Sequence, residues 1–384
     1  MGFTRPGVQT ELDRFFKLIS KNPSNFASIT KSAFTQSRRK LKPEAFIELN
    51  SSQLSYFKAN APNQRKWKQR RVVAIDGSLL NLPHTQAVKE AFGSVNNQHE
   101  EVVSARCSFA YDVCNELVVD AIIAPRRSCE KELAVQHLSA LNPTEDILVF
   151  DRGYPCQWLM GLLDKQGFKF CFRLSSAWKQ AHKLMAADQQ DKDWTLIRGA
   201  RREWGKLQTY GLSKTLEGLR LVSIPLSSGQ KEILVTNLTN REQYAVADLA
   251  ALYNLRWGVE EGYKSFKKTL HIEHFSGKTE QAIRQDFHAR VCMLNMASMV
   301  RTQGAQPKNN SNKGHTYKPS KTQVFAKVKD FLLDIFYRND FKNIIKQMLN
   351  ILQKRLEMVR PDRSFPRYKT SSRRRHKIKS SKGI

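Results

Sequence analysis

Two short apolar runs constrain the fold of this 384-residue chain more than any other feature. Residues 72–78 read Val-Val-Ala-Ile-Asp-Gly-Ser, and residues 147–154 read Ile-Leu-Val-Phe-Asp-Arg-Gly-Tyr. A continuous apolar run of this length, closed by turn residues, is typical of a strand buried on both faces. Both predicted strands end in an acid and a glycine, which places Asp76 and Asp151 at strand ends. Buried strands alternating with helical segments predict an α/β fold.

The segments around these strands support that fold class. A β-hairpin is expected over residues 105–125, helices near 130–141 and 156–166, and a further strand over 169–174. The alternation of strand and helix is then lost between residues 176 and 235. Three β-rich runs fall there, at 194–198, 219–225 and 233–237. This part is therefore expected to be a mostly β insertion.

A helical region from about residue 244 to 302 carries a spaced set of polar side chains. It contains the pattern Tyr-x2-Arg-x3-Glu-x6-Lys, made by Tyr253, Arg256, Glu260 and Lys267. Residues three, four and seven apart share one face of a helix. We therefore expect one stripe that holds an aromatic ring, two cations and a single carboxylate. A carboxylate among cations suits a metal ligand flanked by groups that bind phosphate.

The charge of the chain indicates its partners. Lys and Arg number 64 against 35 Asp and Glu, a net charge of +29, which favours nucleic acid although other polyanionic surfaces attract such a protein too. The six cysteines lack CxxC spacing, which argues against zinc and for buried thiols in a reducing compartment. The N-terminus has no apolar core typical of a signal peptide, and no run reaches a membrane span. No membrane partner is expected.

The N-terminal region has the pattern of a DNA-reading helix. Residues 28–41 form a predicted N-capped amphipathic helix with Ile29, Ala33, Phe34 and Leu41 inward. Its outward residues suit the recognition helix of a helix-turn-helix, whereas the simpler interpretation is a solvated basic face. The candidates for DNA contact are Lys31, Gln36, Arg38 and Arg39.

The predicted organisation has five parts. Residues 304–321 are rich in Asn, Lys, Gly and Ser and are typical of a linker, and a helix pair is expected over 322–358. The last residues include Lys and Arg but no Asp or Glu. They are expected to form a disordered tail that binds DNA. The parts are a helical DNA-binding domain (1–68), a catalytic domain (69–303), a linker (304–321), a helical C-terminal region (322–366) and the tail (367–384).

Asp76, Asp151 and Glu260 together offer the oxygen ligands that divalent cations prefer. Neighbouring strands lie about 4.8 Å apart, so the two aspartates can share a site if their strands are adjacent. Each acid alone is an ordinary strand-end or surface charge, and only the combination favours a metal site. Rival carboxylates are Asp112, Asp120 and Glu261; Asp112 lies inside a β run, as a structural acid or a supporting group of the site.

These motifs together resemble the DDE transposases of bacterial insertion sequences, and most of all insertion-sequence family four with its Tyr-Arg-Glu-Lys signature. The resemblance covers about residues 28–300. It implies a ribonuclease-H-like catalytic core in which Asp76, Asp151 and Glu260 bind two Mg²⁺ ions, with Mn²⁺ as a substitute. It implies strand cleavage at the terminal inverted repeats and strand transfer, with Tyr253, Arg256 and Lys267 gripping phosphates.

The same resemblance implies partners and a location. The substrates are double-stranded DNA at the element ends and at the target, the active complex is a homodimer, and the enzyme works in the bacterial cytoplasm, associated with the nucleoid. Members of the family stack a flipped base on an aromatic ring of the insertion. The candidates are Trp178, Trp194 and Trp204, each of which also suits the core.

Other interpretations stay open. The alternatives to a transposase are a ribonuclease-H-like nuclease without strand transfer and a DNA-binding protein whose catalytic core has decayed. Arg152 is either a phosphate contact or a solvated charge. The three histidines of the helical region do not fit the metal set and are interpreted as facing DNA or simply polar: His271, His274 and His288.

Overall fold

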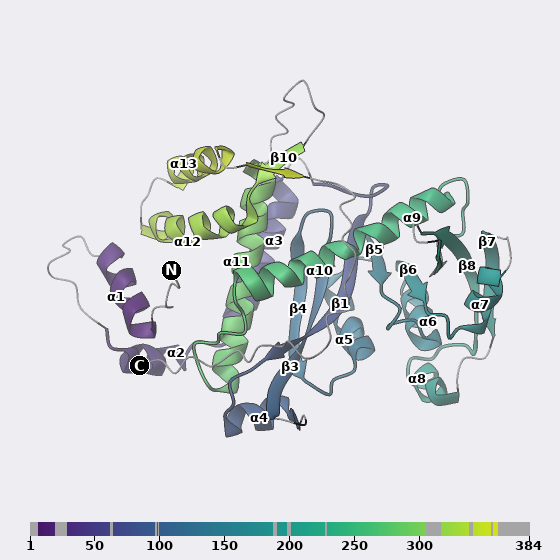
Figure 1. Ribbon diagram of the computed structural model, residues 1–384, viewed down its shortest axis with the longest axis horizontal. Coiled ribbons are helices and arrows are strands. Elements are labelled where there is room, and N and C mark those ends of the chain that lie inside the picture. Colours follow the sequence, from purple (N-terminus) through teal and green to yellow (C-terminus); the bar gives the residue numbers. More distant parts are fainter. Residues whose placement is uncertain are drawn as a thin grey trace. The chain divides into compact units, whose positions relative to one another are not determined.

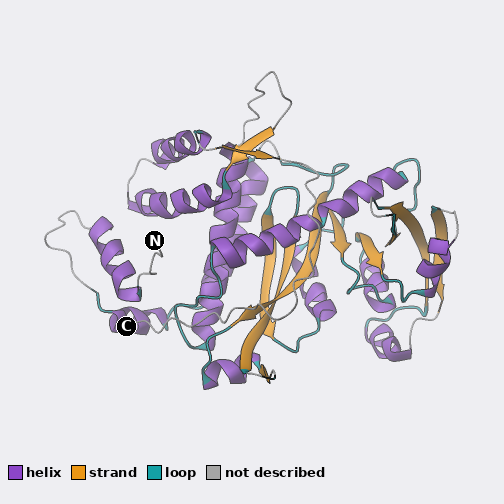
Figure 2. Cartoon of the chain, viewed as in Figure 1, coloured by secondary structure: helices purple, strands orange, loops and turns teal. Residues whose placement is uncertain are grey.

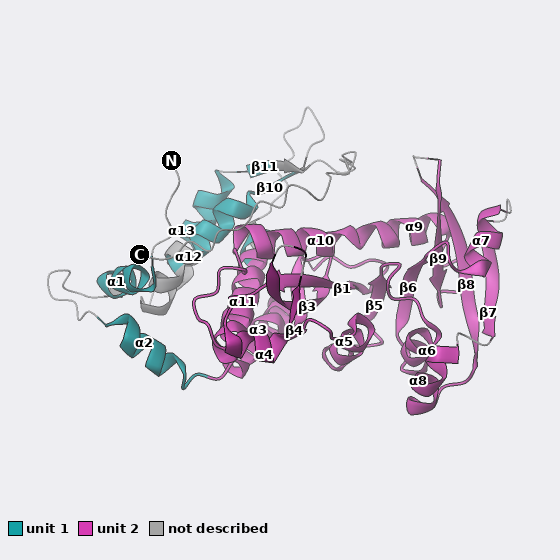
Figure 3. Cartoon of the chain, turned by 60° about the horizontal axis from the view of Figure 1, so that its bottom comes forward, with its two compact units in different colours: residues 1–41, 300–384 teal, residues 42–299 magenta. Residues whose placement is uncertain are grey.

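The computed structural model describes the chain in segments and divides it into two compact units (Figure 3). The units comprise residues 1–41 with 300–384, and residues 42–299. This places the helix α3 (Glu44–Asn60) in the larger unit, whereas the expected boundary of a DNA-binding domain lay at residue 68. The described residues are 7–19, 29–61, 64–96, 98, 100–186, 190–197, 201–226, 229–304, 316–337, 341–354 and 356–359.

The larger unit is built on one mixed sheet covered by helices (Figure 2). In its described part the strands run in the order β4-β3-β1-β5-β6-β9-β8-β7, with β2 paired to the start of β3. The strands are β1 (Arg71–Asn81), β2 (Ser94–Asn96), β3 (Glu101–Asp112), β4 (Leu117–Pro125), β5 (Asp146–Phe150), β6 (Lys169–Leu174), β7 (Asp191–Ile197), β8 (Thr215–Pro225) and β9 (Lys231–Thr236).

The first half of the sheet matches the expected strands. β3 and β4 form the predicted hairpin beside β1, and β1, β5 and β6 are mutually parallel. All five residues of β5 are buried, as its continuous apolar run predicts for a strand covered on both faces. The predicted α/β class is confirmed at the level of a mixed α/β fold.

The helices of the larger unit cover both faces of this sheet. One face carries a core in which α5 and α6 pack over side chains such as Ile75 and Phe150. On the other face Phe109 of β3 stacks on Tyr263, with ring centroids 4.5 Å apart. The helices are α4 (Gln86–Phe92), α5 (Glu130–Gln136), η1 (His137–Ala140), α6 (Gln157–Lys165), α7 (Lys179–Ala186), η2 (Arg201–Glu203), α8 (Trp204–Thr209), α9 (Val246–Leu255), α10 (Trp257–Lys264), η3 (Ser265–Thr269) and α11 (Glu280–Gly304).

The region after β6 is the predicted insertion, and it extends the sheet. β9 pairs antiparallel with β6, and β8 and β7 follow outward, with α7 and α8 in the same region (Figure 1). The three β-rich runs of the sequence correspond to these three strands. Residues 227 and 228, between β8 and β9, lie outside the described residues; beside them Leu226 N donates to the carbonyl of Gln230 at 2.8 Å and Gly229 N to the carbonyl of Leu226 at 2.9 Å.

The smaller unit is helical in its described part, with one short strand pair. It contains α1 (Val8–Ile19), α2 (Lys31–Arg38), α12 (Lys321–Tyr337), α13 (Phe341–Gln353) and the antiparallel strands β10 (Thr316–Pro319) and β11 (Leu356–Val359). The strand β10 lies within the predicted linker, and β11 overlaps the last residues of the helix pair predicted over 322–358, so these residues form a strand and not a helix. The tail over 367–384 lies outside the described residues. None of the described helices is both long and apolar enough to cross a bilayer.

The predicted recognition helix exists as α2, but its expected inward face is wrong. Thr30 caps the helix by accepting a hydrogen bond from Ala33 N at 3.1 Å, whereas the expected cap, Ser28, lies outside the described residues. No residue of α2 is buried, and Phe34 is 37% exposed. The physical reason is its length: a two-turn helix, fastened to Gln9 of α1 at its N-terminal end, leaves its other sides in solvent.

Candidate active site

Asp76 and Asp151 lie side by side at one edge of the parallel strands. The last residue pair that joins β1 to β5 is Ile75 with Phe150, and each aspartate is the next residue of its chain. The prediction that Asp76 ends its strand is wrong, because β1 continues to Asn81 through its pairing with β3. The sheet therefore narrows at Asp76, where β5 has ended and β1 has not, and both aspartates are half-buried at this step.

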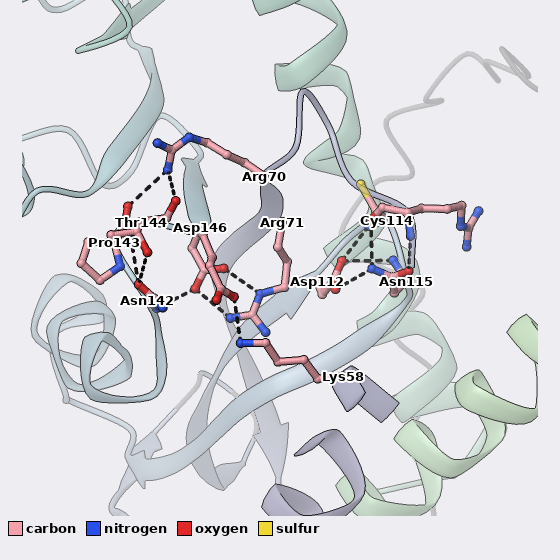
Figure 4. Close-up of polar contacts among 12 residues, drawn as sticks. Lys58, Arg70, Arg71, Asp112, Cys114, Asn115, Asn142, Pro143, Thr144 and Asp146 are labelled. Carbon is pink, nitrogen blue, oxygen red and sulfur yellow. Dashed lines mark hydrogen bonds and ion pairs between the residues drawn. The ribbon is translucent and has the colours of Figure 1, made fainter. Parts of the chain in front are cut away.

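An ion pair at the opposite end of the two strands fixes this register (Figure 4). Arg71 opens β1 and donates to both carboxylate oxygens of Asp146, the first residue of β5, at 2.7 Å each. Asn142 N donates to the same carboxylate at 2.8 Å, and the Asp146 side chain is fully buried. A bidentate guanidinium–carboxylate pair is directional as well as strong, so it aligns the two strands at their first residues.

The predicted stripe of Tyr, Arg, Glu and Lys passes over this edge, although it is not one helix. The helical path breaks at Arg256 between α9 and α10, which run end to end in Figure 1, and it continues as the π-helical turn η3. The Tyr253 hydroxyl donates to Asp151 Oδ1 at 3.3 Å, and Arg256 Nη2 donates to Glu260 Oε1 at 3.2 Å. Three of the four stripe residues are thus joined to one another or to an aspartate.

Lys267, the fourth residue of the stripe, binds to the backbone of β1. It lies in the π-turn, where its ammonium donates to the carbonyl of Leu79 at 2.6 Å, three residues beyond Asp76 on the same strand. Gly262 helps α10 approach the sheet this closely, since a Cβ there would lie 2.9 Å from the Tyr111 ring. The helix is anchored to β1 a second time by Tyr263, whose hydroxyl donates to the carbonyl of Asp76 at 2.7 Å.

Burial and the neighbouring carboxylates both affect the pKa of Asp76 at this edge. Burial raises the pKa of Asp76 to about 6, with the neighbouring charges of Asp151 and Glu130 adding to the rise and Arg256 opposing it. Burial likewise raises the pKa of Tyr253. A carboxyl group whose charge is disfavoured in this way gains from a nearby cation, which stabilises the ionised form.

Asp76, Asp151 and Glu260 are the oxygen donors that fit a divalent cation at this edge. Their chemistry suits Mg²⁺, which prefers carboxylates and water. Among the described residues, however, no three acidic, His or Cys side chains converge tightly enough to enclose an ion, and Glu260 is held by Arg256. The donors are therefore present at one edge without forming a closed cluster.

Sequence reasoning missed an ion pair that lies close to this edge. Glu232 of β9 pairs with Arg173 of β6 at 3.0 Å and is nearly buried. Burial raises the pKa of Glu232, while Arg173 and Arg256 lower it. The strand predicted from the sequence begins at Ile233, one residue too late to include this acid. Only the antiparallel pairing of β9 with β6 brings Glu232 level with the end of β6.

The rival carboxylates have other roles. Asp112 is a structural acid: it is buried and accepts hydrogen bonds from the backbone of Cys114 and from Asn115 in the turn between β3 and β4 (Figure 4). Asp120 binds His137 Nδ1 at 2.6 Å. Glu261 is exposed and pairs with Lys264. None of the three replaces Glu260 on the helix face that carries Arg256.

The remaining candidates divide between surface and core. Arg152 is exposed. The three tryptophans of the insertion pack against its core; Trp178 meets Trp194 edge to face, and Trp204 carries the ammonium of Lys214 4.5 Å above its ring. His271 and His274 are exposed, whereas the position of His288 does not suit contact with DNA. It is buried on α11, and burial lowers its pKa to about 4.

The DNA-contact candidates of α2 belong to the smaller unit. Lys31, Gln36 and Arg39 are exposed, and Arg38 is half-buried. Gln36 Nε2 donates to Ser32 Oγ at 3.3 Å, one helical turn before it. The polar side chains expected to face outward therefore do so within this unit.

Comparison with known proteins gives the family. A model of the family described as "Transposase DDE domain" matches residues 67–296, a span that includes both aspartates and the whole Tyr-Arg-Glu-Lys stripe. The chain belongs to this transposase family. The match confirms the resemblance inferred from the sequence motifs.

Two individual proteins are similar to this family member. It is 23% identical over 259 residues to the "Transposase InsG for insertion sequence element IS4" of Escherichia coli strain K12, covering 65% of this chain and 55% of that protein. The chain thus spans about half the length of this relative. The piggyBac transposase in a synaptic complex with hairpin DNA shares 10% identity and a TM-score of 0.43, over 73% of this chain and 57% of that one.

Proposed function

We propose that this protein is a transposase that binds the terminal inverted repeats of an insertion sequence and cuts and joins DNA strands there. The observation that carries the proposal is the position of Asp76 and Asp151, each directly after the last paired residue of β1 and β5, with Tyr253 bonded to Asp151 and Arg256 to Glu260. A basic protein with carboxylates and phosphate-binding groups at one edge suits phosphoryl transfer on DNA.

A ribonuclease-H-like catalytic core is part of this proposal. Its support is the order β4-β3-β1-β5-β6, in which the first three strands are antiparallel and the last three parallel. Helix α6 connects the parallel neighbours β5 and β6, as parallel pairing requires, and α5 lies between β4 and β5 in the chain. The insertion β7–β9 then separates the second aspartate from the glutamate, an order that the sequence also predicted.

The three carboxylates are proposed to hold two Mg²⁺ ions, with Mn²⁺ as a substitute. Such ions supply charge stabilisation for the attacking and leaving oxygens of a phosphodiester when they are bound. Asp76 and Asp151 are fixed by the sheet, whereas Glu260 comes from α10 and is tethered to Arg256. Movement of Arg256 toward a phosphate would release Glu260 toward the aspartates, so DNA binding and assembly of the carboxylates are coupled in this scheme.

The cations and the tyrosine of the stripe are proposed to grip phosphates. Arg256 is 4% exposed, and its Nε is buried without a hydrogen-bond partner within the described residues. An unsatisfied buried guanidinium nitrogen favours binding of an external oxygen acceptor. Tyr253 would orient that phosphate beside Asp151, and Lys267 would contribute a point charge near Leu79.

The remaining partners are also proposals. Helix α2 would read or grip the element end through Lys31, Gln36, Arg38 and Arg39, since it presents these side chains on a surface without buried residues. Joining two element ends requires two catalytic sites in one complex, which supports a homodimer in the active state. Target DNA would bind at the same edge of the sheet after the element ends have been cleaved.

The test is an assay of the full chain with Mg²⁺ on labelled DNA that carries the terminal repeats flanking its gene. We expect nicked and joined products with the parent protein and neither with Asp76→Ala. Cleavage without joined products would favour a nuclease without strand transfer. Binding without cleavage by either protein would reject the enzyme in favour of a decayed DNA-binding protein.

A further inference from the structure

A fourth carboxylate approaches Asp76 from the opposite face of the sheet. Asp76 is the cross-strand partner of Phe109, whose ring stacks on Tyr263 of α10, so Asp76 and α10 share one face. Side chains alternate along a strand, so Gly77 points to the other face, where α5 packs. Glu130, the first residue of α5, fills the space that a Gly77 side chain would occupy.

The contact between Glu130 and Gly77 is close. A Cβ built on Gly77 would lie 3.2 Å from Glu130 Oε1 and 3.3 Å from its Cγ and Cδ. The missing side chain therefore lets the carboxylate reach the backbone of β1 beside Asp76. The glycine of the Asp-Gly-Ser motif thus leaves room for the close approach of an acid, whose side chain would have to shift if a Cβ were present.

Arg106 holds Glu130 in this position. Its guanidinium pairs with Glu130 Oε1, while its Nε donates to the carbonyl of Arg126 at 3.3 Å. The residue is on β3, opposite Leu79, and is therefore on the same face as Gly77. Arg106 binds one of the two carboxylate oxygens of Glu130, and the side chain keeps 39% of its surface exposed.

Tyr154 provides an independent observation that points to a ligand. It follows Asp151 by three residues and is 2% exposed, yet its hydroxyl has no hydrogen-bond partner within the described residues. Burial and the charges of Asp76 and Glu130 raise the pKa of this hydroxyl, which places it within electrostatic reach of both acids. A buried hydroxyl without a partner costs free energy unless a water molecule or ligand completes it.

We propose that Glu130 and Tyr154 form a second wall of the metal site, on the face opposite Glu260, and hold the water shell of a divalent cation bound at Asp76 and Asp151. This inference rests on the proposed function and adds two positioning residues to it. Mg²⁺ keeps several of its waters when it binds to protein carboxylates, and those waters need acceptors and donors around them. Glu130 is an acceptor, and Tyr154 supplies a hydroxyl that neither donates nor accepts a hydrogen bond in the part of the chain that the structure describes.

The test measures the affinity of the full chain for Mn²⁺, through the electron paramagnetic resonance signal of the free ion during titration. Glu130→Gln is compared with Glu132→Gln, a control on the same helix whose carboxylate pairs with the exposed Lys206 instead. Loss of a group that supports a metal from its outer shell costs about 10- to 100-fold in affinity. We expect a loss of that size in Glu130→Gln and parent affinity in Glu132→Gln.

The variant Asp76→Asn shows whether the aspartate itself binds the ion, and the result for Glu130→Gln is interpreted against it. Weak Mn²⁺ binding by Asp76→Asn together with parent affinity in Glu130→Gln would overturn the inference and leave the proposed function standing. Parent affinity in both variants would overturn both, because the aspartate itself would then be no ligand.

Two further variants separate positioning from folding. Tyr154→Phe keeps the ring against Phe150 and removes only the hydroxyl, so it is expected to lower Mn²⁺ affinity without lowering the melting temperature. Gly77→Ala displaces Glu130 and should weaken Mn²⁺ binding in the parent but add nothing in a Glu130→Ala background, where the acid is already gone. Equal losses from Gly77→Ala in both backgrounds would contradict the role of Glu130.

Discussion

Arg71 and Asp146 stand opposite each other as the first residues of β1 and β5, and Asp76 and Asp151 each follow five residues later along the chain. The buried ion pair thus sets the register that aligns the two candidate metal ligands. A slip of one residue would turn every side chain of the moving strand to the other face. The alignment of the site therefore depends on a contact at the far end of the strands.

Breaking this pair is expected to be costly. Arg71→Met leaves the Asp146 carboxylate buried without its guanidinium, and removal of one partner of a buried pair typically costs about 3–5 kcal/mol. The free energy of unfolding, measured by urea denaturation, checks this. Lys58→Met is the control, because its pair with Glu145 is exposed and should contribute less than about 1 kcal/mol. Equal effects of the two substitutions would refute the structural role of Arg71.

Asp76 is expected to reduce stability in the metal-free protein at neutral pH. Its pKa in the folded state, about 6, lies above the ordinary value of 3.8, so the folded state binds the proton more tightly than the unfolded state does. The stability that this proton contributes is present at acid pH and is lost as the pH rises toward and through 6. Asp76→Asn should therefore stabilise the protein by on the order of 2 kcal/mol at pH 7.5 and by little at pH 3.5. Melting temperatures at the two pH values test this, and equal gains at both would contradict it.

Glu260 and Glu261 are adjacent acids with opposite expected importance. Glu260→Ala removes the carboxylate held by Arg256 and should lower DNA cleavage by about a thousandfold or more while end binding persists. Glu261→Ala removes an exposed partner of Lys264 and should leave cleavage within a few-fold of the parent. Cleavage rates and gel-shift binding on the same labelled DNA give both quantities. Full cleavage by Glu260→Ala would remove this residue from the site.

A buried cation ties β8 to β7 and to the segment between β9 and α9. Arg220 of β8 donates twice to Asp191, at 2.9 and 2.7 Å, and also to the carbonyls of Leu238 and Tyr244. Arg220→Met leaves these acceptors unsatisfied and should cost about 3–5 kcal/mol. Arg241→Met, at the exposed partner of the same Asp191, serves as the control and should cost less than about 1 kcal/mol. Thermal unfolding and limited proteolysis of residues 190–245 would separate the two outcomes.

The basic tail is expected to bind DNA without sequence preference. Removal of residues 367–384 takes away Lys and Arg residues but no acid, so fewer counterions are released on binding. The dissociation constant should rise similarly for specific and random DNA, and the slope of log affinity against log salt should become shallower. Fluorescence anisotropy between low and moderate salt measures both. An unchanged slope would show that the tail makes no phosphate contacts.

Sequence reasoning predicted the elements whose signal is local. The apolar runs of β1 and β5, the β3–β4 hairpin and the three strands of the insertion follow from patterns of four to eight residues. The length of β1 did not, because its last residues are held by β3 rather than by their own apolar character. The break at Arg256 and the π-turn at Lys267 were also missed, since helix periodicity alone does not reveal either. Glu232 and Glu130 reach the site through pairing and packing between segments distant in sequence.

The four-residue pairing of β6 with β9 has a mechanical consequence. Because the insertion shares backbone hydrogen bonds with the strand next to Asp151, it cannot rotate as a separate body without tearing the sheet. Any adjustment to a bound DNA end must then be taken up by side chains, by the helices α7 and α8 or by the path from α9 to η3. The carboxylates and the insertion would therefore keep the same distance from each other through successive cleavage and joining steps.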